Sequence, residues 1–393
     1  MKIFCFIDSL GSGGAQRQIV ALGLGLKRRG NEIRFLMYHD DDHFLDILKE
    51  NDIPYYVIRA NSYIKRLFEV RRILRSGWQE VVLAFLGAPS FYAEIASIPD
   101  RAWLLIVGER LADPNMNQMW GRLLRQFHRF ADVVVSNSHT NRMMLEFLFP
   151  FLEKKLCTIY NTVDLNRFQP TYHKEEDGVI GGSDYLSVVV FASYQRKKNM
   201  LNLAKAMNLV AKMNIDKRIV INWYGDMPAD LSAYEETRQY IESKRLERML
   251  YLNSSVKNVE KEMRKADVVG LFSFYEGLPN VICEGMACGK PILLSEVCDA
   301  SNLVKDGING YLCNPYSPED MAEKIVRMAT LNPDDRRQMG RESRLMSERL
   351  FKEEVVLERY EKIIMHSFVS KELNWPPDVP VSASVTVEHW YKK

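Results

Sequence analysis

Residues 272–291 have the sequence FSFYEGLPNVICEGMACGKP and are the most informative stretch of the chain. An apolar run over residues 268–272 leads into this stretch and predicts a buried strand. A loop rich in glycine and proline follows, and Asn280 is a residue type that favours the N-cap of a helix. A helix over residues 281–288 and a strand over residues 291–294 complete a strand–loop–helix–strand unit. Such units build parallel α/β sheets.

The same alternation extends along most of the chain. The other apolar runs that we expect to form buried parallel strands are residues 3–7, 32–38, 81–85, 103–107, 133–136, 187–192, 219–224, 249–252 and 310–312. Helix-length segments lie between them, at residues 16–29, 119–130, 199–213, 232–245, 259–265 and 319–329. The pattern therefore predicts an α/β protein with two doubly wound, Rossmann-like domains.

The domain boundaries follow from the chain length and from one polar stretch. A chain of 393 residues is long enough for two domains. The polar residues 169–184 separate the two series of strands and helices. We predict an N-terminal domain over residues 1–170, a C-terminal domain over 171–351, a crossing helix over 352–373 and an extended tail over 374–393.

The composition excludes several classes of protein. The 53 Lys and Arg residues nearly balance the 51 Asp and Glu residues, which argues against a dedicated nucleic-acid binder. No two of the six cysteines have C-x-x-C spacing, so reduced thiols in a cytoplasmic protein are expected rather than zinc or disulfides. Asp8 interrupts the first apolar run before a signal peptide could form, and no run of about 20 apolar residues predicts a membrane span.

The loop after the first strand, DSLGSGGAQ at residues 8–16, is rich in glycine. Gly13 and Gly14 would let the backbone approach an anion at the start of the next helix. A dinucleotide fingerprint requires glycine where Gln16 stands, although Asp40 matches its acidic residue. An NAD-dependent dehydrogenase and a purely structural turn therefore stay open as alternatives.

Two further groups of charged residues follow strands of the second domain. Arg196, Lys197 and Lys198 come after its first strand, where they could hold a diphosphate or form an ordinary solvated face. Glu276 lies in the loop of the opening stretch, and Glu284 lies one turn into the next helix. These carboxylates could accept hydrogen bonds from sugar hydroxyls while the loop amides bind phosphate. Capping and a surface ion pair are the structural alternative.

Several motifs together resemble one enzyme family. The spacing Glu276-x7-Glu284, the run GMACGKP at residues 285–291 and the run VKDGINGYL at residues 304–312 are similar to those of the retaining glycosyltransferases of family 4. Residues 9–16 and 159–164 resemble two N-terminal motifs of the same family. The resemblance covers about residues 1–365. It implies a GT-B fold, with an interdomain cleft and a C-terminal helix that packs back on the N-terminal domain.

The resemblance also implies roles for individual residues. Glu284 would hold the ribose of the nucleotide, and Glu276 would contact the donor sugar. Lys198 matches the family lysine, whereas Ser193 stands at the usual arginine position, so Arg196 is expected to substitute. The expected catalytic residues are Glu276, Lys198 and Arg196. The expected donor-binding residues are Gly13, Gly14, Gly277, Leu278, Pro279, Asn280 and Glu284.

The acceptor side is expected in the N-terminal domain. Residues 109–114 look like the acceptor loop of family members that build bacterial surface polysaccharides, so Glu109 and Arg110 are expected to bind the acceptor. Many relatives carry histidine at the position of Arg110, and an arginine can bind or stabilise charge but cannot act as a base. His139 follows a strand end and is the third candidate, with a structural role as its alternative.

These inferences combine into one functional expectation. The chain would move a sugar from a nucleotide-diphosphate sugar, with UDP as the expected nucleotide, to a glycan or lipid-linked glycan in O-antigen, capsule or lipopolysaccharide synthesis. We expect no cofactor and no metal, since the D-x-D pattern at residues 40–42 is typical of a solvated loop. A nucleotide-sugar epimerase of the same architecture and a non-catalytic protein that binds a sugar nucleotide or a glycan are the alternatives.

A peripheral membrane contact is also expected. Residues 119–130 combine Trp120 and Leu123 with Arg122, Arg125 and Arg129. A basic amphipathic helix of this kind suits an anionic membrane surface, although an ordinary helix with one core face has the same pattern. The expected location is the cytoplasm, at the cytoplasmic face of the inner membrane.

Overall fold

The computed structural model describes residues 1–110, 118–170 and 185–369. The chain folds into two compact units. Unit 1 contains Met1–Thr162 and the segment that starts at Glu353, and unit 2 contains Val163–Lys352. Most of the predicted linker, residues 111–114 of the predicted acceptor loop and the predicted tail lie outside the described residues.

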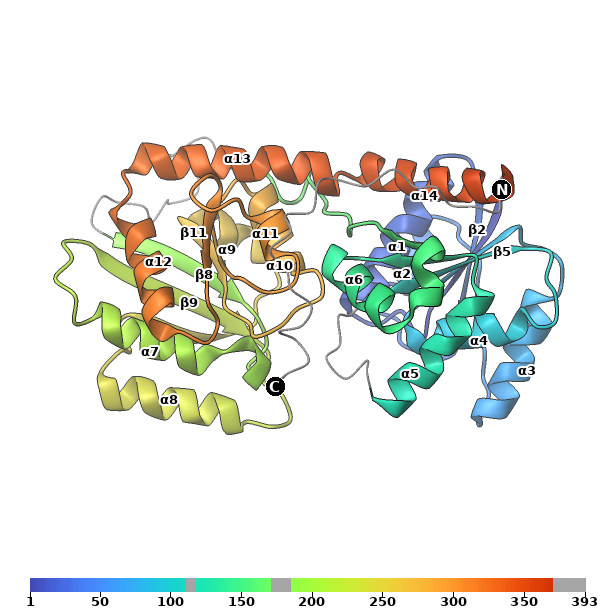
Figure 1. Ribbon diagram of the computed structural model, residues 1–393, viewed down its shortest axis with the longest axis horizontal. Coiled ribbons are helices and arrows are strands. Elements are labelled where there is room, and N and C mark those ends of the chain that lie inside the picture. The colour runs from blue at the N-terminus through green and yellow to red at the C-terminus, as the bar shows by residue number, and fades with distance from the viewer. Residues whose placement is uncertain (111–117, 171–184, 370–393) are drawn as a thin grey trace. The chain divides into compact units, whose positions relative to one another are not determined.

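Unit 1 is built on a seven-stranded parallel sheet with the order β3-β2-β1-β4-β5-β6-β7 (Figure 1). Its strands are β1 Lys2–Phe6, β2 Glu32–Met37, β3 Tyr55–Val57, β4 Val81–Phe85, β5 Leu104–Glu109, β6 Val133–Ser136 and β7 Leu156–Thr158. Its α-helices are α1 Gly14–Arg28, α2 Leu45–Glu50, α3 Tyr63–Leu74, α4 Gly87–Ala96, α5 Met119–Gln126, α6 His139–Leu148 and α14 Glu353–Val369. The described residues of this unit also form the 3₁₀ turns η2 Phe127–Phe130 and η3 Pro150–Lys155.

The apolar runs of unit 1 form strands because both faces of the sheet are covered. Successive side chains of a strand point to opposite faces. Ile3 and Cys5 of β1 therefore join the core that includes α1 and α14. Phe4 and Phe6 join the core that includes α3, α4 and α6. A strand buried on both sides has few polar positions, which is the pattern that the sequence shows.

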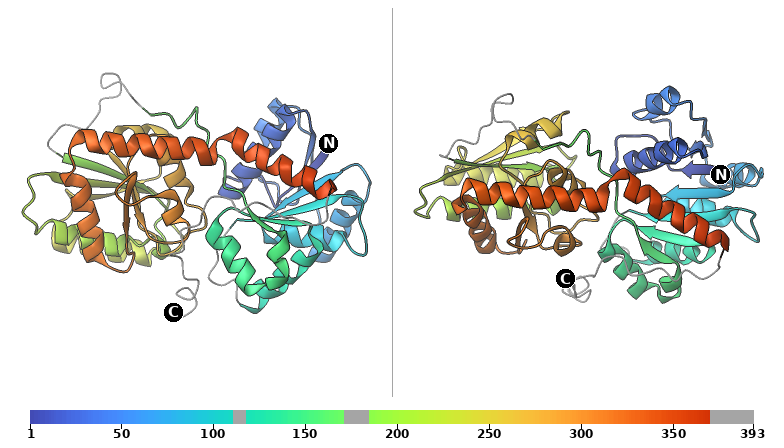
Figure 2. Two further views of the ribbon diagram at one scale, coloured as in Figure 1. Left: turned by 45° about the horizontal axis from the view of Figure 1, so that its top comes forward. Right: turned by 90° about the horizontal axis from the view of Figure 1, so that it is seen from above.

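The C-terminal helix packs on the N-terminal sheet unit, as the resemblance predicted. A Cβ atom on Gly25 of α1 would lie 2.7 Å from Cδ1 of Leu357, so only glycine allows α14 to approach this closely. Two ion pairs, Arg28–Glu353 at 2.6 Å and Arg29–Glu361 at 2.5 Å, flank this contact. Figure 2 shows α14 beside α1 in unit 1.

Unit 2 is built on a six-stranded parallel sheet with the order β10-β9-β8-β11-β12-β13. Its strands are β8 Tyr185–Phe191, β9 Arg218–Gly225, β10 Leu250–Ser254, β11 Val268–Leu271, β12 Ile292–Ser295 and β13 Gly310–Cys313. Its helices are the 3₁₀ turn η4 Arg196–Lys198 and α7 Met200–Val210, α8 Ser232–Lys244, α9 Val259–Lys265, α10 Asn280–Ala287, α11 Ala300–Leu303, α12 Pro318–Thr330 and α13 Pro333–Phe351. The predicted pair of doubly wound α/β sheets is thus confirmed.

Both sheets reverse their strand order at one place. In unit 1 the reversal lies between β1 and β4, and in unit 2 it lies between β8 and β11. In open α/β sheets, ligands bind at the carboxyl ends of the strands beside such a reversal. The loops after β8 and β11 contain Lys198 and Glu276, respectively, so the fold places both residues at this position.

Several local features differ from the prediction. The predicted elements did not include the strands β3 and β7 or the helices α2, α3, α4, α6 and α11. The 19-residue helix α13 was not predicted, because most of its residues are polar and its buried face uses small residues such as Gly340 and Ser343. The helix expected over residues 119–130 is α5 followed by η2. The N-cap role expected for Asn280 is wrong, since Pro279 occupies the cap position and Asn280 is the first residue of α10.

Candidate functional site

An ion pair between Lys198 and Glu276 lies at the strand reversal of unit 2. The Lys198 Nζ atom is 2.5 Å from the Glu276 Oε1 atom, and the Ser273 hydroxyl donates to the same oxygen at 2.6 Å. The two side chains are only 17% and 14% exposed. The structure thus brings together two of the three predicted catalytic residues, in a position that keeps one edge open to solvent.

The backbone of Glu276 is held by Cys298, which follows β12. The Glu276 amide donates to the Cys298 Sγ atom at 3.2 Å, and the thiol donates to the Glu276 carbonyl oxygen. Burial raises the pKa of Cys298, so it stays a neutral thiol that can donate this hydrogen bond. The sequence analysis missed this role, and no motif spacing around Cys298 signals it.

The loop that carries Lys198 is tied to the loop that carries Glu276. The amide of Phe274 donates to the carbonyl oxygen of Lys197 at 2.9 Å. Asn199, which precedes α7, has a φ of 66°, a left-handed conformation that asparagine tolerates better than most residues. Its side-chain amide donates to the carbonyl oxygens of Phe272 at 3.0 Å and Pro315 at 2.7 Å. The loops that carry Lys198 and Glu276 are therefore fixed relative to each other.

The third predicted catalytic residue has a different partner. The Arg196 Nη1 atom is 2.9 Å from the Glu236 Oε2 atom of α8. Both side chains are about half exposed or more, at 63% and 48%. The structure therefore places Arg196 in an exposed pair with α8, while Lys198 pairs with Glu276.

The predicted donor-binding loop leads directly into α10. Gly277, Leu278 and Pro279 are buried, and the Pro279 carbonyl oxygen accepts from the first turn of the helix, at 2.9 Å from the Ile282 amide. Glu284 is buried and lies four residues after Asn280, hence on the same side of the helix. The positive end of the α10 dipole and two carboxylates are thus close together along the chain.

In unit 1, Gly13 and Gly14 form the junction between the first loop and α1. Gly13 is the N-cap and Gly14 is the first helical residue. The Asp8 carboxylate accepts from the Gln16 side-chain amide at 3.0 Å, and a Cβ atom on Gly13 would lie 2.2 Å from the Gln16 Oε1 atom. Gln16, which breaks the dinucleotide fingerprint, therefore folds back over Gly13 and fixes the loop to Asp8.

Glu109 is the centre of a buried charge cluster on the predicted acceptor side. Its Oε1 atom is 2.9 Å from Nε2 of His128, and its Oε2 atom is 3.1 Å from Nη2 of Arg125. The other imidazole nitrogen of His128, Nδ1, is 2.5 Å from Oε1 of Glu94. All but Arg125 are at least nine-tenths buried. Glu109 was predicted from the sequence as a site residue, whereas Glu94 and His128 were not, because they belong to no motif.

The cluster shifts the pKa of each of its titratable members. Burial alone would raise the pKa of Glu109, but Arg125 and His128 outweigh it and lower that pKa to about 2. Burial alone would lower the pKa of His128, but Glu94 and Glu109 outweigh it and raise that pKa to about 9. Burial raises the pKa of Glu94, against the attraction of His128. At neutral pH, Glu109 is thus ionised and His128 is protonated.

The guanidinium of Arg110 contacts residues from separate parts of unit 1. Its guanidinium donates to the Asn161 Oδ1 atom at 3.2 Å and to the Tyr360 hydroxyl at 2.6 Å. It also lies 3.7 Å above the centre of the Phe85 ring. Arg110 therefore joins β5 to the segment that leaves unit 1 and to α14, which returns to it.

His139, the third predicted acceptor residue, is the first residue of α6 and is 5% exposed. Its ring meets the Tyr160 ring edge-on, with 5.6 Å between the centroids. The side-chain amide of Asn141, on the same helix, donates to the carbonyl oxygen of Glu109 at 3.4 Å. The ends of β5 and β6 thus bring His139 to the same region as Glu109.

The described residues contain neither a metal-binding cluster nor a helix that could span a membrane. In the part of the chain that the structure describes, no group of three or more His, Cys, Asp or Glu residues could hold a metal ion. Asp40, in the D-x-D pattern, pairs with Arg59 at 3.6 Å. None of the described helices has the length and apolar composition that a bilayer span requires. All six cysteines are buried and free.

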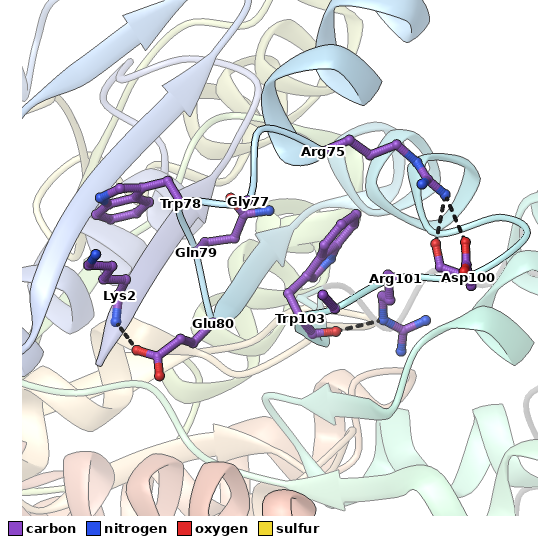
Figure 3. A pocket seen from close by; sticks show the side chains of 10 residues that line it. Lys2, Arg75, Gly77, Trp78, Gln79, Glu80, Asp100, Arg101 and Trp103 are labelled. Carbon is purple, nitrogen blue, oxygen red and sulfur yellow. Dashed lines mark hydrogen bonds and ion pairs between the residues drawn. The ribbon is translucent and has the colours of Figure 1, made fainter.

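A hollow lined by Trp78 and Trp103 lies at the opposite, amino ends of β1, β4 and β5 (Figure 3). Its charged groups have internal partners: Arg75 donates to the Asp100 carbonyl oxygen at 2.6 Å, and Arg101 donates to the Trp103 carbonyl oxygen at 2.9 Å. Ligands of parallel sheets bind at the carboxyl ends of the strands. This hollow is therefore separate from the candidate site.

Two family models match the chain, one in each unit. The Glycosyltransferase Family 4 model matches residues 12–167, and the model for glycosyl transferases group 1 matches residues 186–330. The two matches cover both sheets and the loops that carry the candidate site. Together with the paired α/β sheets, they define an enzyme of the GT-B class. The chain belongs to the family 4 glycosyltransferases.

Sequence relatives are found among bacterial glycosyltransferases. One from Campylobacter jejuni, named N-acetylgalactosamine-N,N'-diacetylbacillosaminyl-diphospho-undecaprenol 4-alpha-N-acetylgalactosaminyltransferase, is 25% identical over 75% of this chain and 80% of its own length. Another, from Escherichia coli, is named UDP-Gal:alpha-D-GlcNAc-diphosphoundecaprenol alpha-1,3-galactosyltransferase. It is 26% identical over 44% of this chain and 45% of its own length.

Solved structures show the same fold. Anabaena HepE, crystallised with UDP, has a TM-score of 0.80 and 20% sequence identity, over 93% of this chain and all of HepE. Sucrose-phosphate synthase from Thermosynechococcus elongatus has a TM-score of 0.75 and 17% identity, over 94% of this chain and 99% of that protein. Both likenesses confirm the GT-B fold.

The cluster around His128 predicts a pH-dependent stability. Because the pKa of His128 rises from 6.5 to about 9 on folding, its stabilising contribution is complete below pH 6.5 and is lost as the pH rises through 9. Glu109, lowered from 4.5 to about 2, contributes above pH 4.5 and loses its contribution as the pH falls through 2. We expect thermal unfolding to show the highest stability between pH 4.5 and 6.5, with a loss of a few kcal/mol at most by pH 9.5.

The variant His128→Gln should remove the decline between pH 6.5 and 9.5, since glutamine does not titrate. His39→Gln, at an exposed position, is the matched control and should keep the wild-type profile. An identical decline in His128→Gln and in the wild type would contradict this assignment.

Proposed function

We propose that this chain is a retaining glycosyltransferase that moves a sugar from a UDP-sugar to a lipid-linked glycan in the synthesis of a bacterial surface polysaccharide such as O-antigen, capsule or lipopolysaccharide. The observation that carries the proposal is the Lys198–Glu276 pair, held at the strand reversal of unit 2 directly before α10. The UDP bound to HepE and the diphospho-undecaprenol substrates in the names of the two bacterial relatives support this choice of donor and acceptor.

The donor diphosphate would replace the Glu276 carboxylate as the partner of the Lys198 ammonium group. Lys198 is already oriented by Glu276 and keeps part of its surface open, so a diphosphate can approach its ammonium group. The amides at the start of α10 would donate to the same phosphates. Glu276 could then accept from a hydroxyl of the donor sugar, and Glu284 from the ribose hydroxyls. The donor-binding role of Gly13 and Gly14, at the start of α1 in unit 1, stays a prediction.

Arg196 would contribute a second cation after a small rearrangement. Its present partner, Glu236, is solvent-exposed, and exposed ion pairs contribute only about 0–1 kcal/mol. A diphosphate carries more charge than one carboxylate, so an exchange of partners is energetically accessible. This exchange is the role that we propose for Arg196.

The transfer itself would proceed on one face of the sugar. The bond between the anomeric carbon and the diphosphate oxygen breaks, while the acceptor hydroxyl oxygen forms a bond to the same carbon from the same side. The acceptor proton passes to an oxygen of the leaving diphosphate. Lys198 and the helix amides stabilise the negative charge that develops there, which is often the largest contribution to catalysis. This route needs no protein nucleophile and no metal.

The acceptor is proposed to bind in unit 1, near Glu109, Arg110 and His139. Both carboxylate oxygens of Glu109 are engaged by cations, so Glu109 would orient its neighbours rather than take a proton. Arg110 is positively charged and suits the diphosphate of a lipid-linked glycan. The proposed function therefore assigns this region to binding and leaves the proton transfer to the donor.

A membrane contact would present this acceptor at the cytoplasmic face of the inner membrane. Large apolar side chains are exposed on α5, with Trp120 at 69%, and on α3, with Phe68 at 66%. Both helices contact α4, and each carries basic residues. Apolar side chains beside cations suit an anionic lipid surface. Figure 1 shows α3 and α5 on the same side of the unit 1 sheet.

The Lys198 assignment is tested by Lys198→Met, which keeps the length of the side chain and removes the charge. We expect kcat for sugar transfer to fall by about 100- to 1,000-fold, as for the loss of one group that stabilises a developing anion. Lys197→Met is the matched control, because that ammonium lies over the Tyr275 ring, 5.9 Å from its centre. Steady-state kinetics with a UDP-sugar and a lipid-linked acceptor measure the effect. Equal activity of the two variants would refute the role of Lys198.

The same assay separates the proposal from its main alternative. A transferase leaves the sugar configuration of the donor unchanged when no acceptor is present. An epimerase would convert the donor under these conditions. Conversion of the UDP-sugar to its epimer without acceptor, followed by nuclear magnetic resonance, would overturn the proposed transfer.

Glu284→Gln tests the nucleotide contact. A carboxylate that accepts from the ribose hydroxyls contributes about 1.5–3 kcal/mol, so UDP should bind about 10- to 100-fold more weakly to the variant. Isothermal titration calorimetry measures the affinity directly. Glu247→Gln, at an exposed position of the same unit, is the control. Unchanged UDP affinity in a folded Glu284→Gln protein would contradict the assignment.

The membrane contact is tested by the double variant Trp120→Ser with Leu123→Ser. Each buried apolar side chain contributes about 1.5–3 kcal/mol, so binding to vesicles that contain anionic lipid should weaken at least about tenfold. Leu345→Ser, at a 58% exposed position of α13, is the matched control. Arg125 is left intact because it pairs with Glu109. Vesicle sedimentation that does not distinguish the two proteins would remove the contact from the proposal.

A further inference from the structure

Four charged side chains from four separate elements form a continuous chain inside unit 1. Glu94 comes from α4, His128 from η2, Glu109 from the end of β5 and Arg125 from α5. The contacts are 2.5 Å for Glu94–His128, 2.9 Å for His128–Glu109 and 3.1 Å for Glu109–Arg125. The proposed chemistry at the donor uses none of these contacts, so their purpose needs a separate explanation.

Helix α5 lies at the surface of unit 1, where it contacts α4 and continues directly into η2. Of its eight described residues, none is fully buried. Isolated helices shorter than about 12–15 residues are marginal in water, because too few hydrogen bonds follow the costly first turn. Arg125 of α5 reaches inward, with a side chain that is only 14% exposed. The contact between Arg125 and Glu109 is therefore a main tether of this helix.

The same helix carries the apolar side chains of the proposed membrane contact. Met119 and Trp120 are 73% and 69% exposed, and Leu123 is also exposed. A helix that inserts side chains into a lipid surface needs a fixed orientation, since rotation would turn its apolar residues back toward the protein. The tether at Arg125 supplies that orientation.

We propose that His128 is a positioning residue, which holds the Glu109 carboxylate in place so that Glu109 can tether Arg125 and keep the apolar residues of α5 turned outward to the membrane. The inference rests on the proposed function, which assigns the outward apolar side chains of α5 to a membrane contact. It goes beyond it by assigning roles to Glu94 and His128, which touch neither the donor nor the acceptor in the proposal.

The two imidazole nitrogens explain why the protonated form is needed. Each nitrogen faces a carboxylate oxygen, Nδ1 that of Glu94 and Nε2 that of Glu109. Protonated histidine donates from both nitrogens, whereas neutral histidine donates from one and directs a lone pair at the other carboxylate. Loss of the His128 proton therefore breaks one of the two hydrogen bonds to Glu94 and Glu109. It also leaves a buried carboxylate without its cation.

Charged groups from the elements α4, β5, α5 and η3 surround His128. Glu94 on α4 and Glu109 on β5 face it directly, and Arg125 on α5 acts through Glu109. Lys155 of η3 attracts Glu94 and donates to the carbonyl oxygens of Arg129 and Ala131. The two carboxylates are the nearest groups, and they raise the pKa of His128 to about 9. The series of contacts from Glu94 to Arg125 should thus stay intact at neutral pH and weaken in alkaline solution.

The direct test is hydrogen–deuterium exchange of the α5 amides in His128→Gln. Glutamine keeps hydrogen-bonding capacity but carries no charge. We expect α5 amides to exchange at least about tenfold faster than in the wild type, while the amides of α7 in unit 2 stay unchanged. The variant His128→Lys, whose ammonium group can donate to both carboxylates, should restore slow exchange. The exposed control His39→Gln should match the wild type.

Kinetics supply a readout that a general loss of stability would not produce. In His128→Gln, KM for the lipid-linked acceptor in anionic vesicles should rise several-fold, while KM for the UDP-sugar and kcat stay within about twofold. In the wild type, the acceptor KM should be constant from pH 6 to 8 and rise as the pH passes 9. In His128→Lys this rise should be absent over the same range.

The outcomes separate the inference from the proposed function. Unchanged α5 exchange and unchanged acceptor KM in His128→Gln would overturn the inference, and UDP binding and transfer by that variant would leave the proposed function intact. A wild-type protein that neither binds UDP nor transfers sugar would end the proposed function, whereas α5 exchange would still test the tether. Should His128→Gln fail to fold, exchange of α5 in the wild type between pH 7 and 9.5, corrected for the intrinsic rate, gives the answer: constant protection would overturn the inference.

Discussion

A carboxylate placed at the buried end of a parallel strand requires a cation, and this requirement shapes both units of the chain. Desolvation makes an unpaired buried charge very costly, so each such carboxylate must be matched by a cation and by hydrogen bonds. Glu276 lies in the loop after β11 and is matched by Lys198. Glu109 ends β5 and is matched by His128 and Arg125. The two units differ in how readily the carboxylate can be separated from its cation.

The difference lies in burial and in the number of cations. Glu276 has one cation, and both side chains keep some exposure, so an incoming anion can take the place of the carboxylate. Glu109 has two cations, and its cluster includes Glu94, which is fully buried. An exchange of partners in the Glu109 cluster would leave an unpaired charge in the protein interior. The pair in unit 2 is therefore suited to ligand exchange, and the cluster in unit 1 is suited to holding elements together.

The sequence was sufficient to predict the architecture because the signals for it are local. Strands buried on both faces appear as short apolar runs, and the residues after each strand reveal the binding edge of the sheet. Lys198, Glu276 and Glu284 were found this way, together with the family resemblance. Helix α13 was missed because it buries small residues such as Ser343 and Gly340, which give no apolar periodicity.

The partners of the candidate site could not be predicted, because they depend on contacts between distant segments. Cys298 holds the backbone of Glu276 from 22 residues away, and Glu94 reaches His128 across 34 residues. Neither contact belongs to a motif with fixed spacing. Such pairs form only after strands from separate parts of the chain lie side by side, so a single sequence shows the residue types but not their pairing.

Arg110 shows how the structure changes the meaning of a residue that the sequence singled out. An arginine at a position where many relatives have histidine first suggests a change in acceptor chemistry. Its guanidinium, however, joins Asn161, just before the chain passes to unit 2, to Tyr360 on α14, where the chain has returned. Gln18 holds the same junction through the Thr162 amide and carbonyl, at 2.8 and 3.0 Å. Arg110 therefore fixes both passages of the chain at the sheet of unit 1, and any contact that it makes with an acceptor uses a guanidinium whose orientation is already set by the fold.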